Sequence, residues 1–145
     1  MAVAIGTVIA PLPALAGLRP SERVLLEVMN RARTARGLPP FQLDPRLERA
    51  ARQHTRDMLR RGYFDHGAFA RRMKHYGVRG RAVGENLAWW AGYAWARRVV
   101  LMWLESPPHR ANLLRPGFRH VGVAALRGRF DGTKVRMVTA DFAGR

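Results

Sequence analysis

The order of the periodic segments constrains the fold most, because helical patterns fill the first half of the chain and strand patterns fill its end. Ser21 can cap a first helix, and Gly37 suits its left-handed stop. Asp44 followed by Pro45 is a strong start signal for a second helix, which Gly62 ends. Two further helices are expected, over residues 68–76 and 94–105.

Strand patterns dominate the second half. Residues 83–89 are apolar enough for a short buried strand. Residues 121–125 and 135–142 show β-branched alternation, and Asp131-Gly132 between them favours a hairpin turn. Helices around a small antiparallel sheet predict an α+β domain.

Chain length and composition set the next limits. The chain has 145 residues and a mass of 16.4 kDa, which suits one domain better than two. Hydrophobic residues make up 48%, so a packed core is expected. The absence of cysteine excludes disulfides, thiolate metal sites and a cysteine nucleophile.

The chain is strongly basic, with 26 Lys and Arg residues against 10 Asp and Glu residues and a formal net charge of +16. Such an excess is typical of proteins that bind nucleic acid, an anionic membrane surface or an acidic polymer. Only Lys74 and Lys134 are lysines, and Arg, Ala, Gly and Pro are abundant together. A general bias in residue usage therefore explains the charge equally well.

The first residues predict an export signal. Residues 2–18 carry no charge and are mostly apolar, and Ala14-Leu15-Ala16 before Gly17 matches a signal-peptidase site. We expect residues 1–16 to be a signal peptide and residues 17–145 to be a single domain, secreted to the periplasm or the extracellular space. The alternative is an apolar arm that packs on the domain. No later stretch is long and apolar enough to cross a membrane.

Two histidines and two glutamates could carry chemistry: His66, Glu85, Glu105 and His109. Pro107 suits the first position of a helix, which puts His109 in the first turn, where the helix dipole favours the neutral imidazole. Nitrogen and oxygen ligands of this kind could hold a divalent metal such as zinc. The alternative is that each histidine makes one structural hydrogen bond, because the four residues form no compact metal motif.

Several short motifs occur in a characteristic order. They are Asn30-Arg31 with Arg33, Gly37-Leu38 with Leu43-Asp44, the helical set of Leu47, Ala50-Ala51, His54 and Asp57-Met58, then Phe64-Asp65-His66, Gly84-Glu85-Asn86-Leu87, the segment from Trp103 to Leu114, and Phe118 with Val121-Gly122-Val123. In this order they resemble the CAP superfamily of cysteine-rich secretory and plant pathogenesis-related proteins, in its bacterial SCP-like branch without disulfides. The resemblance covers about residues 21–143.

The resemblance implies a three-layer α-β-α sandwich with a central antiparallel sheet and a cleft that holds two histidines and two acids. By motif, His66, Glu85 and His109 carry over directly. The position of the fourth acid falls on Ser106, so Glu105, one residue earlier, is the uncertain fourth member. Some family members bind zinc through the two histidines, and others bind sterols or lipids in a separate groove. We expect any metal here to be dispensable for folding.

The favoured function is a binding module whose cleft holds a divalent metal or a small envelope or lipid ligand. The alternative is a metal-dependent, peptidase-like hydrolase that uses Glu85 as general base. A binder of polyanions or nucleic acid is a remote alternative. Nucleic acid is the less expected partner, since the sequence has no helix-turn-helix or finger motif and a secretion signal argues against it.

The remaining conspicuous residues are expected to be structural or solvated. His54 lies on the apolar face of the second helix, whereas His75 and His120 should face solvent. Trp103 is at core spacing, as is Met102. The other tryptophans are expected equally in packing or in ligand contact: Trp89, Trp90 and Trp95. The arginine pairs are expected on solvated helix faces: Arg60-Arg61, Arg71-Arg72 and Arg97-Arg98.

Overall fold

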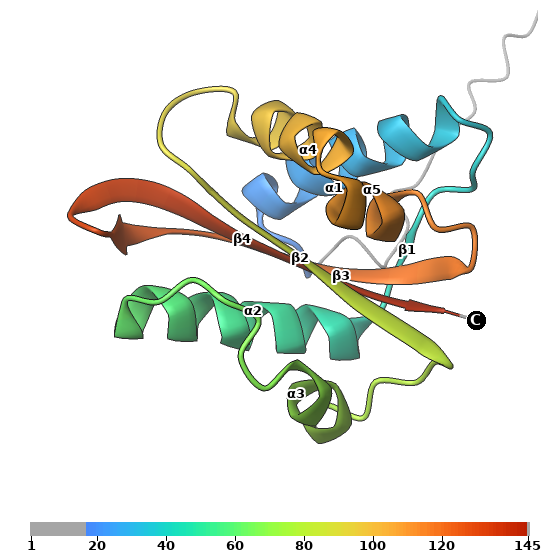
Figure 1. Cartoon of the computed structure of the whole chain (residues 1–145), viewed down its shortest axis with the longest axis horizontal. Coiled ribbons are helices and arrows are strands. Elements are labelled where there is room, and N and C mark those ends of the chain that lie inside the picture. The colour runs from blue at the N-terminus through green and yellow to red at the C-terminus, as the bar shows by residue number, and fades with distance from the viewer. Residues whose placement is uncertain (1–16, 145) are drawn as a thin grey trace, which may run out of the picture.

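The computed structural model describes residues 17–144, so the predicted signal peptide lies outside the described residues. The helices are α1 (Pro20–Thr34), α2 (Pro45–Arg61), α3 (Phe69–His75), α4 (Trp95–Glu105) and α5 (Pro107–Leu113), and the strands are β1 (Gln42–Leu43), β2 (Ala82–Trp90), β3 (Phe118–Phe130) and β4 (Thr133–Gly144). Helices α1, α4 and α5 cover one face of the sheet and α2 and α3 the other, which gives the expected α-β-α sandwich (Figure 1).

The sheet has the strand order β1-β3-β4-β2. The three long strands are antiparallel, as predicted, and the hairpin turns at Asp131 and Gly132, both of which have positive φ. The short strand β1 pairs in parallel with β3, so the sheet as a whole is mixed. Strand β2 pairs with β4 and stands at the edge of the sheet, which matters for the site below.

The helix boundaries follow local sequence signals, with one exception. The Asp44 carboxylate accepts a hydrogen bond from the Arg46 N–H at 2.7 Å, and Gly62 ends α2 at φ 68°. The cap predicted at Ser21 is wrong, because α1 begins one residue earlier with Arg19 in the cap position. The Ser21 hydroxyl instead donates to the Ala125 carbonyl on β3, at 3.3 Å.

The largest part of the core lies between the sheet and the layer of α1 and α4. Trp103 is fully buried there, and its indole N–H donates to the Leu87 carbonyl at 3.0 Å. Val99 is buried as predicted, but Met102 is 40% exposed and the prediction of a core position for it is wrong. Helical spacing places Met102 just beside the buried stripe, where the sequence pattern alone could not exclude it.

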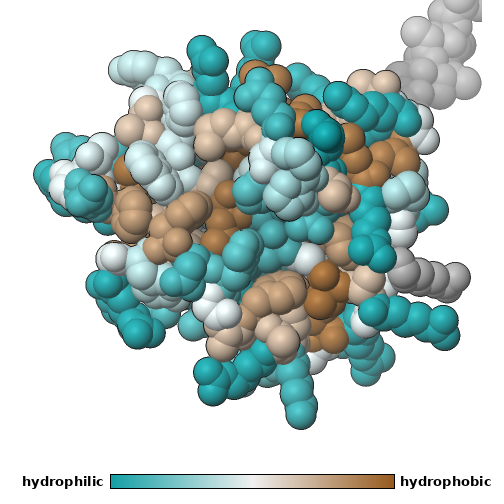
Figure 2. Space-filling view, viewed as in Figure 1, coloured by the Kyte–Doolittle hydropathy of each residue, from teal (hydrophilic) through white to brown (hydrophobic). Residues whose placement is uncertain are grey.

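The other tryptophans pack only in part, and Trp89 is 40% exposed. Trp90 and Trp95 lie partly buried against the main core, and Trp89 packs on Phe130 with ring centroids 5.7 Å apart. Figure 2 shows one face of the molecule, where hydrophilic residues dominate the outline and hydrophobic residues gather nearer the middle. In the described part of the chain, no helix combines the length and apolarity that a membrane span needs.

Candidate functional site

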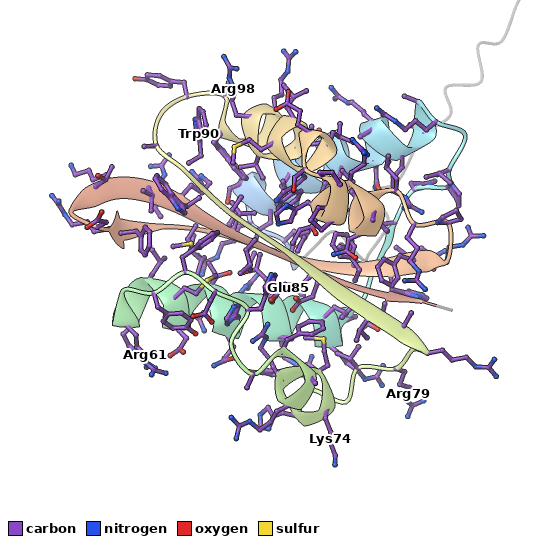
Figure 3. The ribbon with its side chains drawn as sticks, in the orientation of Figure 1. Arg61, Lys74, Arg79, Glu85, Trp90 and Arg98 are labelled. Carbon is purple, nitrogen blue, oxygen red and sulfur yellow. The ribbon has the colours of Figure 1, made fainter. Side chains whose placement is uncertain are left out.

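Glu85 is the centre of a buried polar cluster. Its side chain is only 1% exposed, and Figure 3 shows it in the interior between the sheet and α2. One carboxylate oxygen, Oε1, accepts a hydrogen bond from His66 Nδ1 at 2.7 Å. The other, Oε2, is paired with the guanidinium of Arg72. Both oxygens are therefore engaged by neighbouring side chains.

His66 lies on the loop between α2 and α3, and its side chain is 57% exposed. Because the ionised carboxylate of Glu85 can only accept, Nδ1 of His66 carries the proton of this hydrogen bond. The neutral imidazole then keeps a lone pair on Nε2. The fold therefore brings together His66 and Glu85, two of the four residues that the sequence singled out.

His54 supports this pair from α2. The residue is buried, as predicted, and its Nε2–H donates to the Asp65 carbonyl at 2.9 Å, next to His66. The same nitrogen lies 4.0 Å from the Glu85 carboxylate. Burial lowers the pKa of His54, and Arg72 lowers it further, although Glu85 opposes the shift. His54 is thus held neutral and positions the loop that carries His66.

Arg72 was predicted on a solvated helix face, and that prediction is wrong. The residue is buried, ion-paired with Glu85, and donates from Nη1 to the His66 carbonyl at 3.2 Å. Its neighbour Arg71 is exposed as expected. One arginine of a pair can enter a core only when a buried carboxylate compensates its charge, and the sequence does not show that partner.

Asp141 is a site residue that the sequence reasoning missed. It lies opposite Glu85 in the β2–β4 register, is completely buried, and neither of its carboxyl oxygens has a hydrogen-bond partner among the described residues. Burial raises its pKa well above the ordinary value, and the neighbouring charge of Glu85 raises it further. Asp141 therefore keeps its proton to a higher pH than an ordinary aspartic acid does. An acid within the apolar alternation of β4 was the only signal in the sequence.

His109 approaches from the opposite layer, in the first turn of α5. Its Nδ1 is hydrogen-bonded to the Ser106 hydroxyl at 2.7 Å. Ser106 is in the cap position of α5, but its side chain contacts the imidazole and does not cap the helix. Burial lowers the pKa of His109, and the proximity of His66 lowers it further. Glu105 is exposed at the end of α4, and within residues 17–144 it forms no hydrogen bond or ion pair with this cluster.

A ladder of amides connects α5 to the strand that carries Glu85. The Asn86 side chain donates to the His109 carbonyl at 2.9 Å. The Asn112 side chain donates to the Glu85 carbonyl at 3.2 Å and to the Asn86 side chain at 3.0 Å. A Cβ at Gly84 would lie 2.8 Å from the Asn112 side-chain oxygen, so glycine allows this approach. The ladder fixes His109 relative to Glu85 around the edge strand β2.

A cleft of about 790 Å³ opens beside α2 and α3. His54 and Arg72, which both approach Glu85, line it, and so do Asp65 and Gly67 on either side of His66. None of the four residues predicted to share one cleft lines it: His66, Glu85, Glu105 and His109. The cleft therefore reaches the outer side of the polar cluster but leaves the carboxylate shielded.

The two imidazoles, of His66 and His109, have similar hydrogen-bond contacts. In both His66 and His109 the Nδ1 atom is occupied by an oxygen partner, an arrangement that commonly orients metal-binding histidines. Within the described residues, no group of three or more His, Asp or Glu side chains could surround an ion. An ion bound by these imidazoles would therefore complete its coordination with water or with the bound ligand.

The sequence matches the CAP, cysteine-rich secretory protein family, over residues 26–142. It is 37% identical over 107 residues to the protein YkwD of Bacillus subtilis (strain 168), a match that covers 70% of this chain and 41% of that protein. It is 31% identical over 112 residues to the membrane protein YlbC of the same organism, covering 74% and 32%. The chain thus spans less than half the length of these two relatives.

Solved structures share the fold. An extracellular protein of Bacillus anthracis str. Ames that contains an SCP domain has a TM-score of 0.67 and 26% identity, and the match covers 88% of this chain and 44% of that one. An outer surface protein of Borrelia burgdorferi has a TM-score of 0.69 at 20% identity, over 85% and 92% of the two chains, which speaks for the fold alone. With the family match across most of its length and this shared α-β-α sandwich, the chain belongs to the CAP family of cysteine-rich secretory proteins.

Proposed function

We propose that this chain is a secreted CAP binding module in which His66 and His109 together hold a divalent ion or a small ligand. The observation that carries the proposal is the pair of Nδ1 contacts, to Glu85 and to Ser106, each at 2.7 Å. They leave the Nε2 atom of each ring for an outside partner. A bound ion such as Zn²⁺ would supply a Lewis-acidic centre for an oxygen-bearing ligand.

Glu85 acts in this proposal as a positioning residue. Its carboxylate orients His66 and fixes the tautomer, while Arg72 balances its charge. The hydrolase alternative would require the same carboxylate to take a proton from water. A side chain that is 1% exposed, with both oxygens engaged, is poorly placed for that role. The binding function is therefore the better supported of the two.

Secretion is part of the proposal. The apolar segment that ends at Ala14-Leu15-Ala16 suits a signal peptide, and the similar Bacillus anthracis protein is extracellular. N-terminal sequencing of the protein isolated from its native source should find Gly17 first. An intact Met1 on protein from the cytoplasmic fraction would contradict export.

Zinc calorimetry tests the binding site. We expect His66→Ala and His109→Ala each to weaken Zn²⁺ binding at least about tenfold, since even the loss of a hydrogen-bond partner of a ligand has that effect. Binding should also weaken as pH falls through the histidine range near ~6.5, because protonated imidazole cannot bind metal. The lowered pKa of His109 means that its own proton should compete at lower pH than an ordinary histidine's.

His75→Ala and His120→Ala are the matched controls, because neither side chain forms a hydrogen bond or ion pair with the Glu85 cluster in the described structure. They should leave zinc affinity within about twofold of the wild type. Circular dichroism should show that all four variants remain folded without metal. Undiminished zinc binding in both His66→Ala and His109→Ala would overturn the assignment.

A further inference from the structure

A second hollow, lined by none of the histidines, lies at the free edge of β3. It has a volume of about 650 Å³ and lies between the start of α1, the C-terminal part of α2 and the β3–β4 hairpin. No carboxylate lines it. Besides a few small or apolar residues, six arginines do: Arg19, Arg56, Arg60, Arg127, Arg129 and Arg136. A recess with this lining is selective for negative charge.

The hairpin places like charges directly opposite one another. Arg127 on β3 faces Arg136 on β4, and Arg129 faces Lys134. Like charges in such cross-strand pairs destabilise a sheet. Burial lowers the pKa of Arg136, and the charge of Arg127 lowers it further. A bound anion between these side chains would relieve the repulsion.

The arginines of the hollow have few carboxylates to compensate them. Some arginines elsewhere do pair with carboxylates, as Arg52 does with Glu22 and Glu48 and as Arg72 does with Glu85. Among the arginines that line the hollow, only Arg60 forms an ion pair within residues 17–144, with Asp57. Arg129 donates to the Gly132 carbonyl, and Arg136 donates to the Ala125 carbonyl and lies over the Trp95 ring. Arg56 and Arg127 form no hydrogen bond or ion pair in the described structure, so their guanidinium groups are available to a ligand.

The shape and lining favour a linear ligand. Strand β1 pairs with β3 only as far as Val121, so the following part of the β3 edge has no neighbouring strand in the described structure. The hollow extends along this edge, from Ala125 to Arg129. No aromatic side chain lines it, so nothing there would stack on a base. The forked guanidinium is suited to paired phosphate oxygens.

We propose that this arginine groove binds a linear polymer of phosphate or phosphodiester groups through its phosphates. The groove is separate from the His66–His109 site, and neither proposal depends on the other. Binding should rest on counterion release, so affinity should fall steeply with salt.

Titration with inorganic polyphosphate of defined length tests the proposal. The informative variant is Arg56→Gln with Arg127→Gln, since both side chains are exposed and neither forms a hydrogen bond or ion pair in the described structure, so folding should be unaffected. We expect a loss of affinity of about tenfold or more and a salt slope that is shallower by about 2. The matched control, Arg97→Gln with Arg98→Gln on α4, removes the same charge from an exposed helix face and should change affinity less than about threefold.

Three further probes separate the possible partners. Single-stranded DNA with the same number of phosphates should bind with little sequence preference and should lose affinity in the same variant. Equal losses in the two double variants, or no polyphosphate binding near physiological salt, would overturn the proposal and leave residue bias as the cause of the charge. It would equally be overturned if heparin, or vesicles of anionic lipid, bound through Arg56 and Arg127 while polyphosphate did not.

Discussion

At the scale of single residues, the site depends on two neighbouring carboxyl groups in different surroundings. Glu85 is ion-paired with Arg72 and accepts a hydrogen bond from His66. Asp141, in register with it on β4, has no such partner in the described structure, and burial together with the charge of Glu85 raises its pKa. The arrangement keeps one negative charge beside His66 and buries the second acid at a cost to stability.

Asp141→Asn should raise the free energy of unfolding at neutral pH. The pKa of Asp141 is raised in the folded state, so the wild type loses stability as pH rises from about 4, by up to about 1.4 kcal/mol per pH unit until the folded pKa is reached. Asparagine does not ionise, and it keeps the size of the side chain. Urea unfolding of both proteins should show a stability difference that grows with pH over this window.

Asp141→Ala is the control for that comparison. It also removes the ionisable group but leaves a gap where the carboxyl group stood, so it should be less stable than Asp141→Asn at every pH. If the difference between wild type and Asp141→Asn did not change with pH, Asp141 would have an ordinary pKa and the account of the pair would be wrong.

At the scale of secondary-structure elements, close approaches between helices and strands hold the site in place. Asn112 reaches β2 because residue 84 is glycine, and α2 lies against β3 because residue 122 is glycine. A Cβ at Gly122 would overlap the α2 backbone at Leu47 and Glu48. Since α2 also carries His54, the distance between α2 and the sheet sets the position of the loop that holds His66.

Gly122→Ala should destabilise the protein by at least about 3 kcal/mol, because a whole helix must move to make room for one methyl group. Gly62→Ala is the matched control. Gly62 has a left-handed φ of 68° and nothing near its missing Cβ, so the change should cost only about 1–2 kcal/mol. Chemical unfolding of the two variants measures both values. Equal losses would show that α2 can shift away from β3 freely.

The helices and turns show which features the sequence could predict and which it could not. The Asp44-Pro45 start, the Gly62 stop and the Asp131-Gly132 turn are local signals, and the structure has all three. Arg72 and Asp141 were not predicted as site residues, because their roles depend on partners in other elements. A buried ionisable side chain is defined by tertiary contacts that periodicity does not show.

At the scale of the whole molecule, the edge position of β2 explains how two layers can serve one site. His66 belongs to the layer of α2 and α3, and His109 to the layer of α4 and α5 (Figure 1). Strand β2 lies between them, with Glu85 contacting the first layer and Asn86 the second. The order of the sequence motifs predicted the sandwich, but composition and spacing alone could not bring the histidines together.

The most direct test of the central claim is a zinc titration followed by the side-chain NMR signals of the five histidines at pH 7.5. If His66 and His109 share one ion, their signals should shift along a single curve that ends at one equivalent of Zn²⁺. The signals of His75 and His120 should not move over the same range. Separate curves for His66 and His109, or shifts of His75 or His120 at lower zinc than those of the pair, would contradict the shared site.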